Sequence, residues 1–187
     1  MPISTLDART ALIVIDLQNG IVALPTAHST VDVIKQSSAL AAAFRAKNLP
    51  VALVNVGGVA PGRSEQPRRT GDFPPGWADL VPELGRGPSD HLVTKRTWGA
   101  FTNTDLDAYL KGVGATQVVI CGVATSIGVE STARQAYELG YNVALAIDAM
   151  TDMNAHAHAN SVARIFPRLG ETGTTAEIIA KLGETQA

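Results

Sequence analysis

Charged side chains directly follow two apolar segments that are typical of buried strands. Asp16 follows the apolar residues 11–15, and Lys95 ends the segment 91–95. A charge beside a buried strand costs free energy unless it is paired or used. A carboxylate and an ammonium group at one site shift each other's proton affinity and can transfer protons. The two residues therefore suit general acid–base chemistry, with a purely structural ion pair as the alternative.

The segment Gly122–Gly128 is a third candidate, because it joins a predicted strand to a predicted helix. Its sequence, GVATSIG, leaves backbone N–H groups at the helix start open to a ligand. Such groups stabilise a carboxylate or a developing negative charge. No Lys-Ser or Lys-Thr pair follows, which argues against a phosphate-binding loop, and the glycine spacing does not fit a dinucleotide-binding fingerprint.

Other reactive side chains fit a site less well. Cys121 is the only cysteine and lies inside an apolar segment, so we expect a buried, unreactive thiol. His156 and His158 are two residues apart, which places them on different faces of a helix and suits surface or capping roles better than one metal. No Gly-x-Ser-x-Gly motif occurs, so a nucleophile elbow is not expected.

Alternating apolar and helix-like segments predict the elements that position these residues. Strands are expected at 11–16, 51–56, 91–95, 117–121 and 143–148, and helices at 29–48, 104–110, from the glycine segment to 139, at 155–166 and at 175–182. This alternation predicts a doubly wound, three-layer α/β/α domain with a mostly parallel sheet of five or six strands. Ligands of such sheets bind beyond the carboxyl ends of the strands, where Asp16, Lys95, the glycine segment and Asp148 would lie.

Composition indicates one globular domain over residues 1–187, with 45% apolar and 17% charged residues. The net charge of −2 gives no electrostatic reason to expect a nucleic-acid or membrane partner. No apolar run approaches the ~20 residues of a membrane span, and no signal-peptide pattern opens the chain, so we expect a cytoplasmic protein. Residues 57–89 hold six of the ten prolines and predict a long loop with about one helical turn, either a binding loop or a disordered segment.

Three motifs in order resemble the isochorismatase-like hydrolases, a superfamily that includes nicotinamidases and N-carbamoylsarcosine amidases. They are Asp16-Leu-Gln-Asn19, Lys95-Arg-Thr-Trp-Gly-Ala-Phe101 and the Gly-Val-Ala-Thr run before a helix. The resemblance extends from Ala11 to about Leu182 and includes Asp148-Ala-Met-Thr-Asp152. The usual triad of that family is Asp, Lys and a nucleophilic Cys. Asp16 and Lys95 match the first two, whereas Gly128 stands at the cysteine position and supplies no thiolate.

The resemblance implies chemistry without a covalent intermediate. True isochorismatases also carry glycine at this position and hydrolyse a vinyl ether to pyruvate. By this likeness Asp16 acts as general acid, Lys95 holds the substrate and tunes Asp16, and the amides of Ala124 and Gly128 line the site beside a cis Val123–Ala124 peptide. Further substrate contacts are expected from Gln18, Trp98, Phe101, Thr125 and Arg69.

The substrate expected from these residues is a small anionic molecule, an isochorismate-like vinyl ether or another small acid or ether. Arginine binds carboxylates through two parallel hydrogen bonds, which suits Arg69 and its neighbours Arg63 and Arg68. The chain departs from true isochorismatases at 96–99 and 124–126, so the exact substrate stays open. A catalytically inactive protein that binds a small molecule or a partner on the same fold is the alternative.

The resemblance also implies partners and cofactors. Nicotinamidases bind a metal through histidines in the loop after the second strand, but this chain has no histidine between Asn55 and Pro88. We therefore expect no metal and no cofactor. Because family members are commonly dimers or tetramers, we expect a homo-oligomer.

Overall fold

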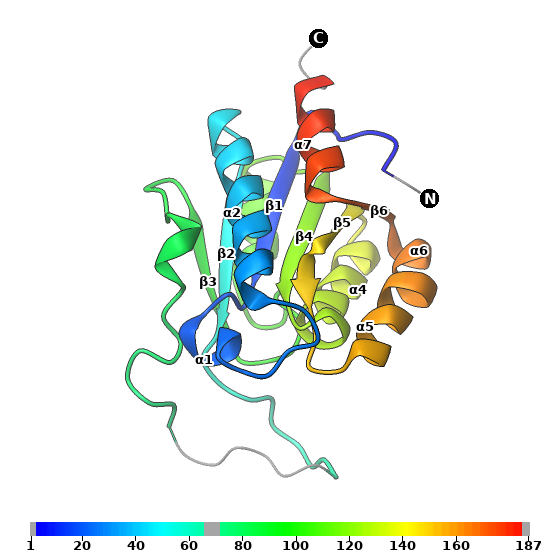
Figure 1. The fold of residues 1–187 in the computed structure, drawn as a ribbon. Helices are drawn as coiled ribbons and strands as arrows, with labels where there is room; N and C mark the ends of the chain where they lie inside the picture. The colour runs from blue at the N-terminus through cyan, green and yellow to red at the C-terminus, as the bar shows by residue number, and fades with distance from the viewer. Residues whose placement is uncertain (1–2, 66–71, 185–187) are drawn as a thin grey trace.

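Six strands form one parallel sheet in the computed structural model, which describes residues 3–65 and 72–184 (Figure 1). The strands are β1 (Thr10–Ile15), β2 (Val51–Val56), β3 (His91–Lys95), β4 (Gln117–Val123), β5 (Asn142–Thr151) and β6 (Glu171–Gly173). They pair in parallel throughout, in the order β3-β2-β1-β4-β5-β6. The predicted doubly wound α/β fold is confirmed, and β6 is the sixth strand.

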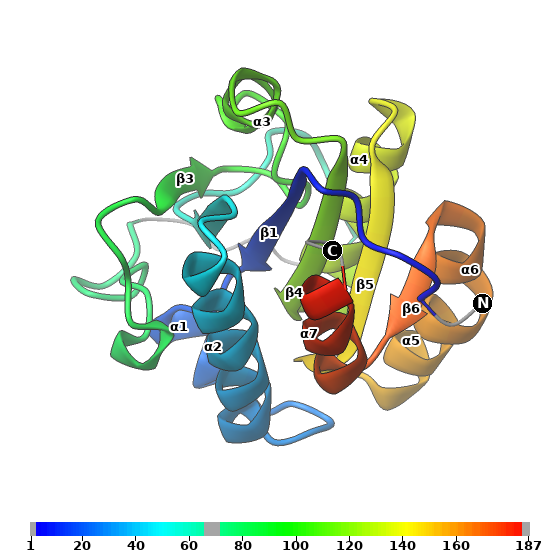
Figure 2. The ribbon, with the colours of Figure 1, turned by 90° about the horizontal axis from the view of Figure 1, so that it is seen from above.

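Helices cover both faces of the sheet. They are α1 (Asn19–Val22), α2 (Thr30–Ala46), α3 (Leu106–Gly112), α4 (Glu130–Glu138), α5 (Ala155–Asn160), α6 (Phe166–Leu169) and α7 (Thr175–Glu184). Figure 2 shows α2 and α7 on one face and α3 and α4 on the other. Among the described residues, no helix has the length and apolar character needed to cross a bilayer.

The burial of β1 explains why its sequence is apolar without alternation. Leu12 and Val14 belong to the core beneath α2 and α7, whereas Ala11, Ile13 and Ile15 belong to the core beneath α3 and α4. Successive side chains of a strand point to opposite faces, so a strand covered on both sides is apolar at most positions, and in β1 Thr10 alone is polar. All six residues of β1 are buried.

The strand order fixes where a ligand can bind. From β1 the chain runs to β2 and β3 on one side and then returns to β4 on the other side. The loops that follow β1 and β4 therefore leave the sheet in different directions and open a crevice at its carboxyl edge. At that edge Ile15 pairs with Gly122.

Two predicted elements differ from the structure. The helix expected at about 155–166 is present, but it consists of α5, a π-helical turn (Ser161–Ile165) and α6. Pro167, in the first turn of α6, has no N–H to continue the preceding hydrogen bonds. Strand β5 also runs past Asp148 to Thr151, three residues beyond its predicted end.

The long loop behaves as predicted in its described parts, with one helical turn at Pro82–Leu84. Its returning part runs antiparallel to the residues that follow β1. Asn19 N donates to Asp79 O at 2.9 Å, and Val81 N donates to Leu17 O at 3.0 Å. These bonds fasten the loop to the carboxyl edge of the sheet.

Gly122 sets the spacing between β1 and β4 and provides a test of the packing. Its φ is +117°, and a Cβ there would collide with the Ile15 carbonyl oxygen. We expect Gly122→Ala to lower the free energy of unfolding by about 2–5 kcal/mol, measured by urea denaturation. The control is Gly112→Ala, where a Cβ would meet nothing within 4 Å. An unchanged stability of Gly122→Ala would contradict the close approach of the two strands.

Candidate active site

Asp16 is the first residue after β1, and its backbone turns away from the sheet. Its φ is +51°, a left-handed conformation that Asp tolerates better than most residues. Its N–H still bonds Val54 O at 2.9 Å, so the residue stays attached to the sheet edge. The side chain is buried at the crevice, where the sequence predicted it.

Lys95 reaches Asp16 from two strands away. It is the last residue of β3 and lies opposite Val56 of β2. Its Nζ donates to Asp16 Oδ2 at 2.7 Å and to Thr97 O at 3.2 Å. Both side chains are almost completely buried, with 2% and 7% of their surface exposed. The structure thus brings together the two charges that the sequence placed at one edge.

Burial dominates the proton affinity of Asp16. Loss of water raises the pKa of its carboxyl from 3.8 to about 6, although the charge and the hydrogen bond of Lys95 act in the opposite direction. Its Oδ1 is buried and has no hydrogen-bond partner among the described residues. Among the described residues, the Asp16 carboxyl is therefore held by the single hydrogen bond from Lys95 to Oδ2.

The segment after β4 brings its glycine against this carboxyl. The Val123–Ala124 peptide is cis, as the resemblance implied, and a π-helical turn follows at Thr125–Val129. A Cβ on Gly128 would lie 2.9 Å from Ile15 Cγ2 and 3.3 Å from Asp16 Oδ2. A side chain at this position would therefore crowd the acidic group, whereas glycine leaves that space open.

Asp152 is a functional candidate that the sequence analysis did not single out. Its Oδ2 accepts from Ser126 N and Ser126 Oγ, both at 2.8 Å, and its Oδ1 accepts from Asn154 N at 3.0 Å. This buried carboxylate therefore holds the start of the π-helical turn that carries Gly128. The signal was a charge directly after a buried strand, which is visible only once β5 is known to end at Thr151.

Asp148 is the corresponding correction. It lies within β5, and its Oδ1 accepts from Thr175 N at 2.7 Å and Thr175 Oγ1 at 2.9 Å at the start of α7. Its carboxylate therefore caps a helix beneath one face of the sheet. The expectation that Asp148 stands at the ligand-binding edge was wrong.

Thr125 and His158 form a polar contact behind the glycine segment. Thr125 Oγ1 and His158 Nδ1 are 2.8 Å apart, and the ring centroids of His158 and His28 are 4.6 Å apart. Burial and the neighbouring His28 lower the pKa of His158. His156 is exposed as expected, but His158 is half-buried and bonded, so a surface role does not describe it.

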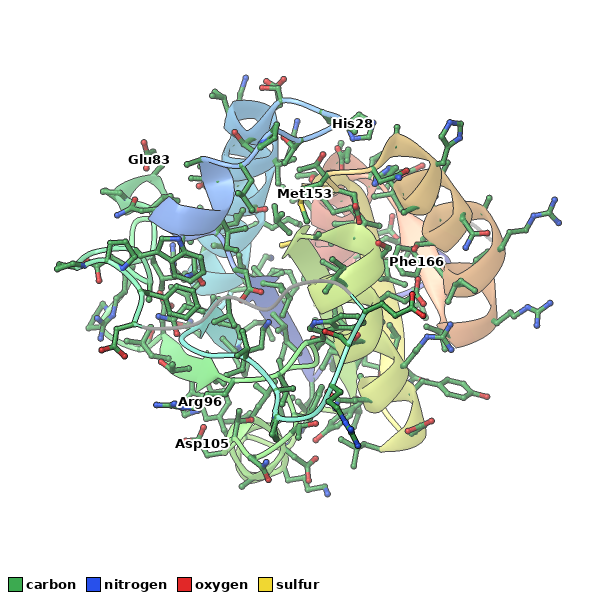
Figure 3. The ribbon with its side chains drawn as sticks, turned by 90° about the horizontal axis from the view of Figure 1, so that it is seen from below. His28, Glu83, Arg96, Asp105, Met153 and Phe166 are labelled. Atoms are coloured by element: carbon green, nitrogen blue, oxygen red, sulfur yellow. The ribbon has the colours of Figure 1, made fainter. Side chains whose placement is uncertain are left out.

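A cavity of about 920 Å³ opens above Asp16 and Lys95. Ala124 and Gly128 also line it, as does Trp98, whose surface is 65% exposed. Figure 3 looks onto this carboxyl edge; it labels Arg96 and Met153, which both line the cavity from different sides.

Several predicted substrate contacts do not line the described cavity. Gln18 is fully buried, with Val56 N donating to its Oε1 at 2.7 Å and its Nε2 donating to Val56 O at 3.1 Å. Phe101 packs against the core and stacks on Tyr141, and Thr125 is fully buried. Their side chains are taken up by packing or by internal hydrogen bonds. Arg69 and Arg68 lie outside the described residues, and Arg63 is exposed away from the lining.

The remaining reactive groups are placed as follows. Cys121 is buried in β4, and burial raises the pKa of its thiol to about 12, which agrees with an unreactive thiol. Within residues 3–65 and 72–184, no group of three or more His, Cys, Asp or Glu side chains could hold a metal ion.

The chain is similar to known proteins over most of its length. The sequence model of the isochorismatase domain matches residues 10–177. The uncharacterized isochorismatase family protein YwoC of Bacillus subtilis is 40% identical over 182 residues, which cover 93% of this chain and 94% of the relative. Streptothricin hydrolase of Streptomyces noursei is 38% identical over 143 residues, which cover 74% of this chain and 48% of the relative.

A solved structure agrees with the fold. The structure of an isochorismatase family protein from Burkholderia thailandensis has a TM-score of 0.92 at 43% identity, and the match covers 96% of this chain and 98% of that one. The arrangement of strands and connecting helices described above is therefore shared over nearly the full length of both chains.

The role of Asp152 leads to a prediction about stability. Asp152→Ala removes the acceptor of two backbone N–H groups and one hydroxyl, so we expect the free energy of unfolding to fall by about 1–3 kcal/mol in urea denaturation. Asp152→Asn keeps a carbonyl oxygen and should lose less. The control is Glu138→Ala at an exposed position of α4, expected within about 0.5 kcal/mol of wild type. Equal stability of Asp152→Ala and wild type would count against the role assigned to Asp152.

Proposed function

The chain belongs to the isochorismatase family, and we propose that it is a hydrolase in which Asp16 protonates a small anionic substrate. The observation that carries this proposal is the buried Asp16–Lys95 pair at the base of the cavity. A carboxyl with a pKa of about 6 is partly protonated near neutral pH, which suits a general acid.

The environment of Gly128 supports direct hydrolysis over a covalent route. Glycine offers no nucleophilic side chain beside Asp16, and the thiol of Cys121 is buried in β4 with a raised pKa. By the family resemblance, an enzyme with glycine at this position cleaves a vinyl ether without an acyl-enzyme. A substrate with an acid-labile ether next to a carboxylate therefore fits best.

The proposed reaction of an enolpyruvyl ether has balanced steps. The carboxyl proton of Asp16 moves to the methylene carbon, whose π electrons form the new C–H bond, and the ether carbon becomes an oxocarbenium ion. Water adds to that carbon and returns a proton to Asp16. In the resulting hemiketal the bond to the ether oxygen breaks as that oxygen gains a proton and the new hydroxyl loses one, which gives pyruvate and the alcohol with one water consumed.

Lys95 has two tasks in this scheme. Its Nζ donates to Oδ2 at 2.7 Å and so holds the carboxyl in place at the base of the cavity. Its positive charge also keeps the pKa of the buried Asp16 from rising further. The ammonium thereby lets one carboxyl both release and recover a proton within one reaction cycle.

Substitution of the acid tests the function. We expect Asp16→Asn to lower kcat at least ~100-fold, because an amide cannot give up a proton as a carboxylic acid does. The measurement is pyruvate release from isochorismate and from simpler enolpyruvyl ethers, coupled to lactate dehydrogenase. The matched control is Glu138→Gln, an exposed carboxylate on α4, expected to keep wild-type activity. If wild type releases no pyruvate from any of these ethers, the vinyl ether proposal fails and the alternative of an inactive binding protein takes its place.

The pH dependence gives an independent test. Because the protonated carboxyl is the active form, kcat/KM should be level below about pH 6 and fall about tenfold per pH unit above it. Lys95 lowers the pKa of Asp16, so Lys95→Met should move this fall to higher pH while reducing the maximum rate. A fall that stays at the same pH in Lys95→Met would contradict the assignment of the titrating group.

A further inference from the structure

The cavity is larger and more apolar than the reacting atoms require. Its volume of about 920 Å³ lies at the upper end of the about 300–1,000 Å³ typical of sites for drug-sized ligands. Apolar side chains supply most of its wall, from α1, the end of β2, the long loop and the segment around Gly128. Such a wall gains affinity by removing apolar surface of a ligand from water.

One wall is aromatic and held in place. The rings of Phe73 and Trp77 stack with centroids 3.9 Å apart and planes 13° from parallel. The Trp77 carbonyl accepts from Gly20 N at 2.9 Å and from Gln18 Nε2 at 3.4 Å. A Cβ on Gly20 would collide with the indole, so the ring lies directly on the backbone after β1. This aromatic surface is therefore positioned before any ligand arrives.

Trp98 adds an aromatic ring at the mouth of the same cavity. It is 65% exposed although it lines the cavity. The large exposed indole leaves apolar surface in contact with water. A flat ligand that stacks on the ring removes that surface from water and makes a favourable ring contact.

The charges of the described lining nearly cancel. When Asp16 is ionised, it and Lys95 neutralise each other at 2.7 Å, and of the described lining residues only Arg96 and Glu65 carry further charges, of opposite sign. A dianion needs a surplus of cations, since a buried unpaired charge is costly. While Asp16 is ionised, the described lining offers Arg96 for one carboxylate and no second unpaired cation.

We propose that the ligand is a planar, conjugated molecule that carries one negative charge. The aromatic wall of Phe73 and Trp77 together with Trp98 would bind the rings, and Arg96 would bind a single carboxylate. The inference rests on the proposed hydrolase function only where it takes this ligand to be the substrate of Asp16. It specifies which kind of small anionic molecule the cavity binds.

Equilibrium binding to the full chain tests the class without needing turnover. The probes are 2-naphthoate, its saturated analogue decahydro-2-naphthoate and the dianion naphthalene-2,6-dicarboxylate, measured by isothermal titration calorimetry. We expect 2-naphthoate to bind about fivefold more tightly than the saturated acid and about tenfold more tightly than the dianion.

Variants link this binding to the cavity. Trp98→Ala should weaken 2-naphthoate about fivefold and the saturated acid less, and Trp98→Phe should restore part of the loss. Tyr137→Ala, an exposed aromatic residue of α4, is the control and should bind like wild type. Circular dichroism checks the fold of each variant.

The outcomes separate this inference from the proposed function. The proposed ligand class is overturned if the dianion or the saturated acid binds as tightly as 2-naphthoate, or if no probe binds up to its solubility. It is also overturned if Trp98→Ala binds 2-naphthoate as tightly as wild type. Asp16→Asn should lose turnover without weakening 2-naphthoate binding, because it leaves the positive charge of Lys95 unpaired. If wild type turns over no ether but binds 2-naphthoate as described, the hydrolase proposal fails and the ligand class stands.

Discussion

The buried ion pair of Asp16 and Lys95 is the interaction on which the site depends. Removing either charge from water costs several kcal/mol, which close approach and further hydrogen bonds must offset. The 2.7 Å contact and the bond from Lys95 to Thr97 O supply both. The pair forms only in the observed register of β1, β2 and β3. A shift of that register by one residue would turn the Lys95 side chain to the opposite face of the sheet.

The switch in strand order makes this pair accessible to a ligand. Strand β4 lies on the other side of β1 and carries Gly128 against Asp16, while Asp152 after β5 holds the turn in which that glycine lies. Gln18 bonds both β2 and the returning loop, so the aromatic wall is fixed to the same edge. The acidic centre, the open space beside it and the wall are thus parts of one sheet edge.

The sequence by itself determined the class of fold and the two charges at the centre of the candidate site. Strands covered on both faces are apolar at most positions, so β1, β2 and β4 are visible as largely apolar segments. A charge directly after such a strand stands out for the same reason, which is how Asp16 and Lys95 were found. Gly122–Gly128 was recognisable because only small residues leave the backbone open at a strand-to-helix turn.

Only the tertiary structure decided which other side chains reach the cavity. Pairing with β4 extends β5 to Thr151. Asp148 therefore lies inside the strand, and Asp152 is the carboxylate that follows its end. Gln18 and Thr125 are close in sequence to the site, yet their side chains turn into internal hydrogen bonds. The direction of a side chain depends on contacts between residues far apart in the chain, such as the 79 positions between Asp16 and Lys95, and local sequence patterns do not encode these contacts.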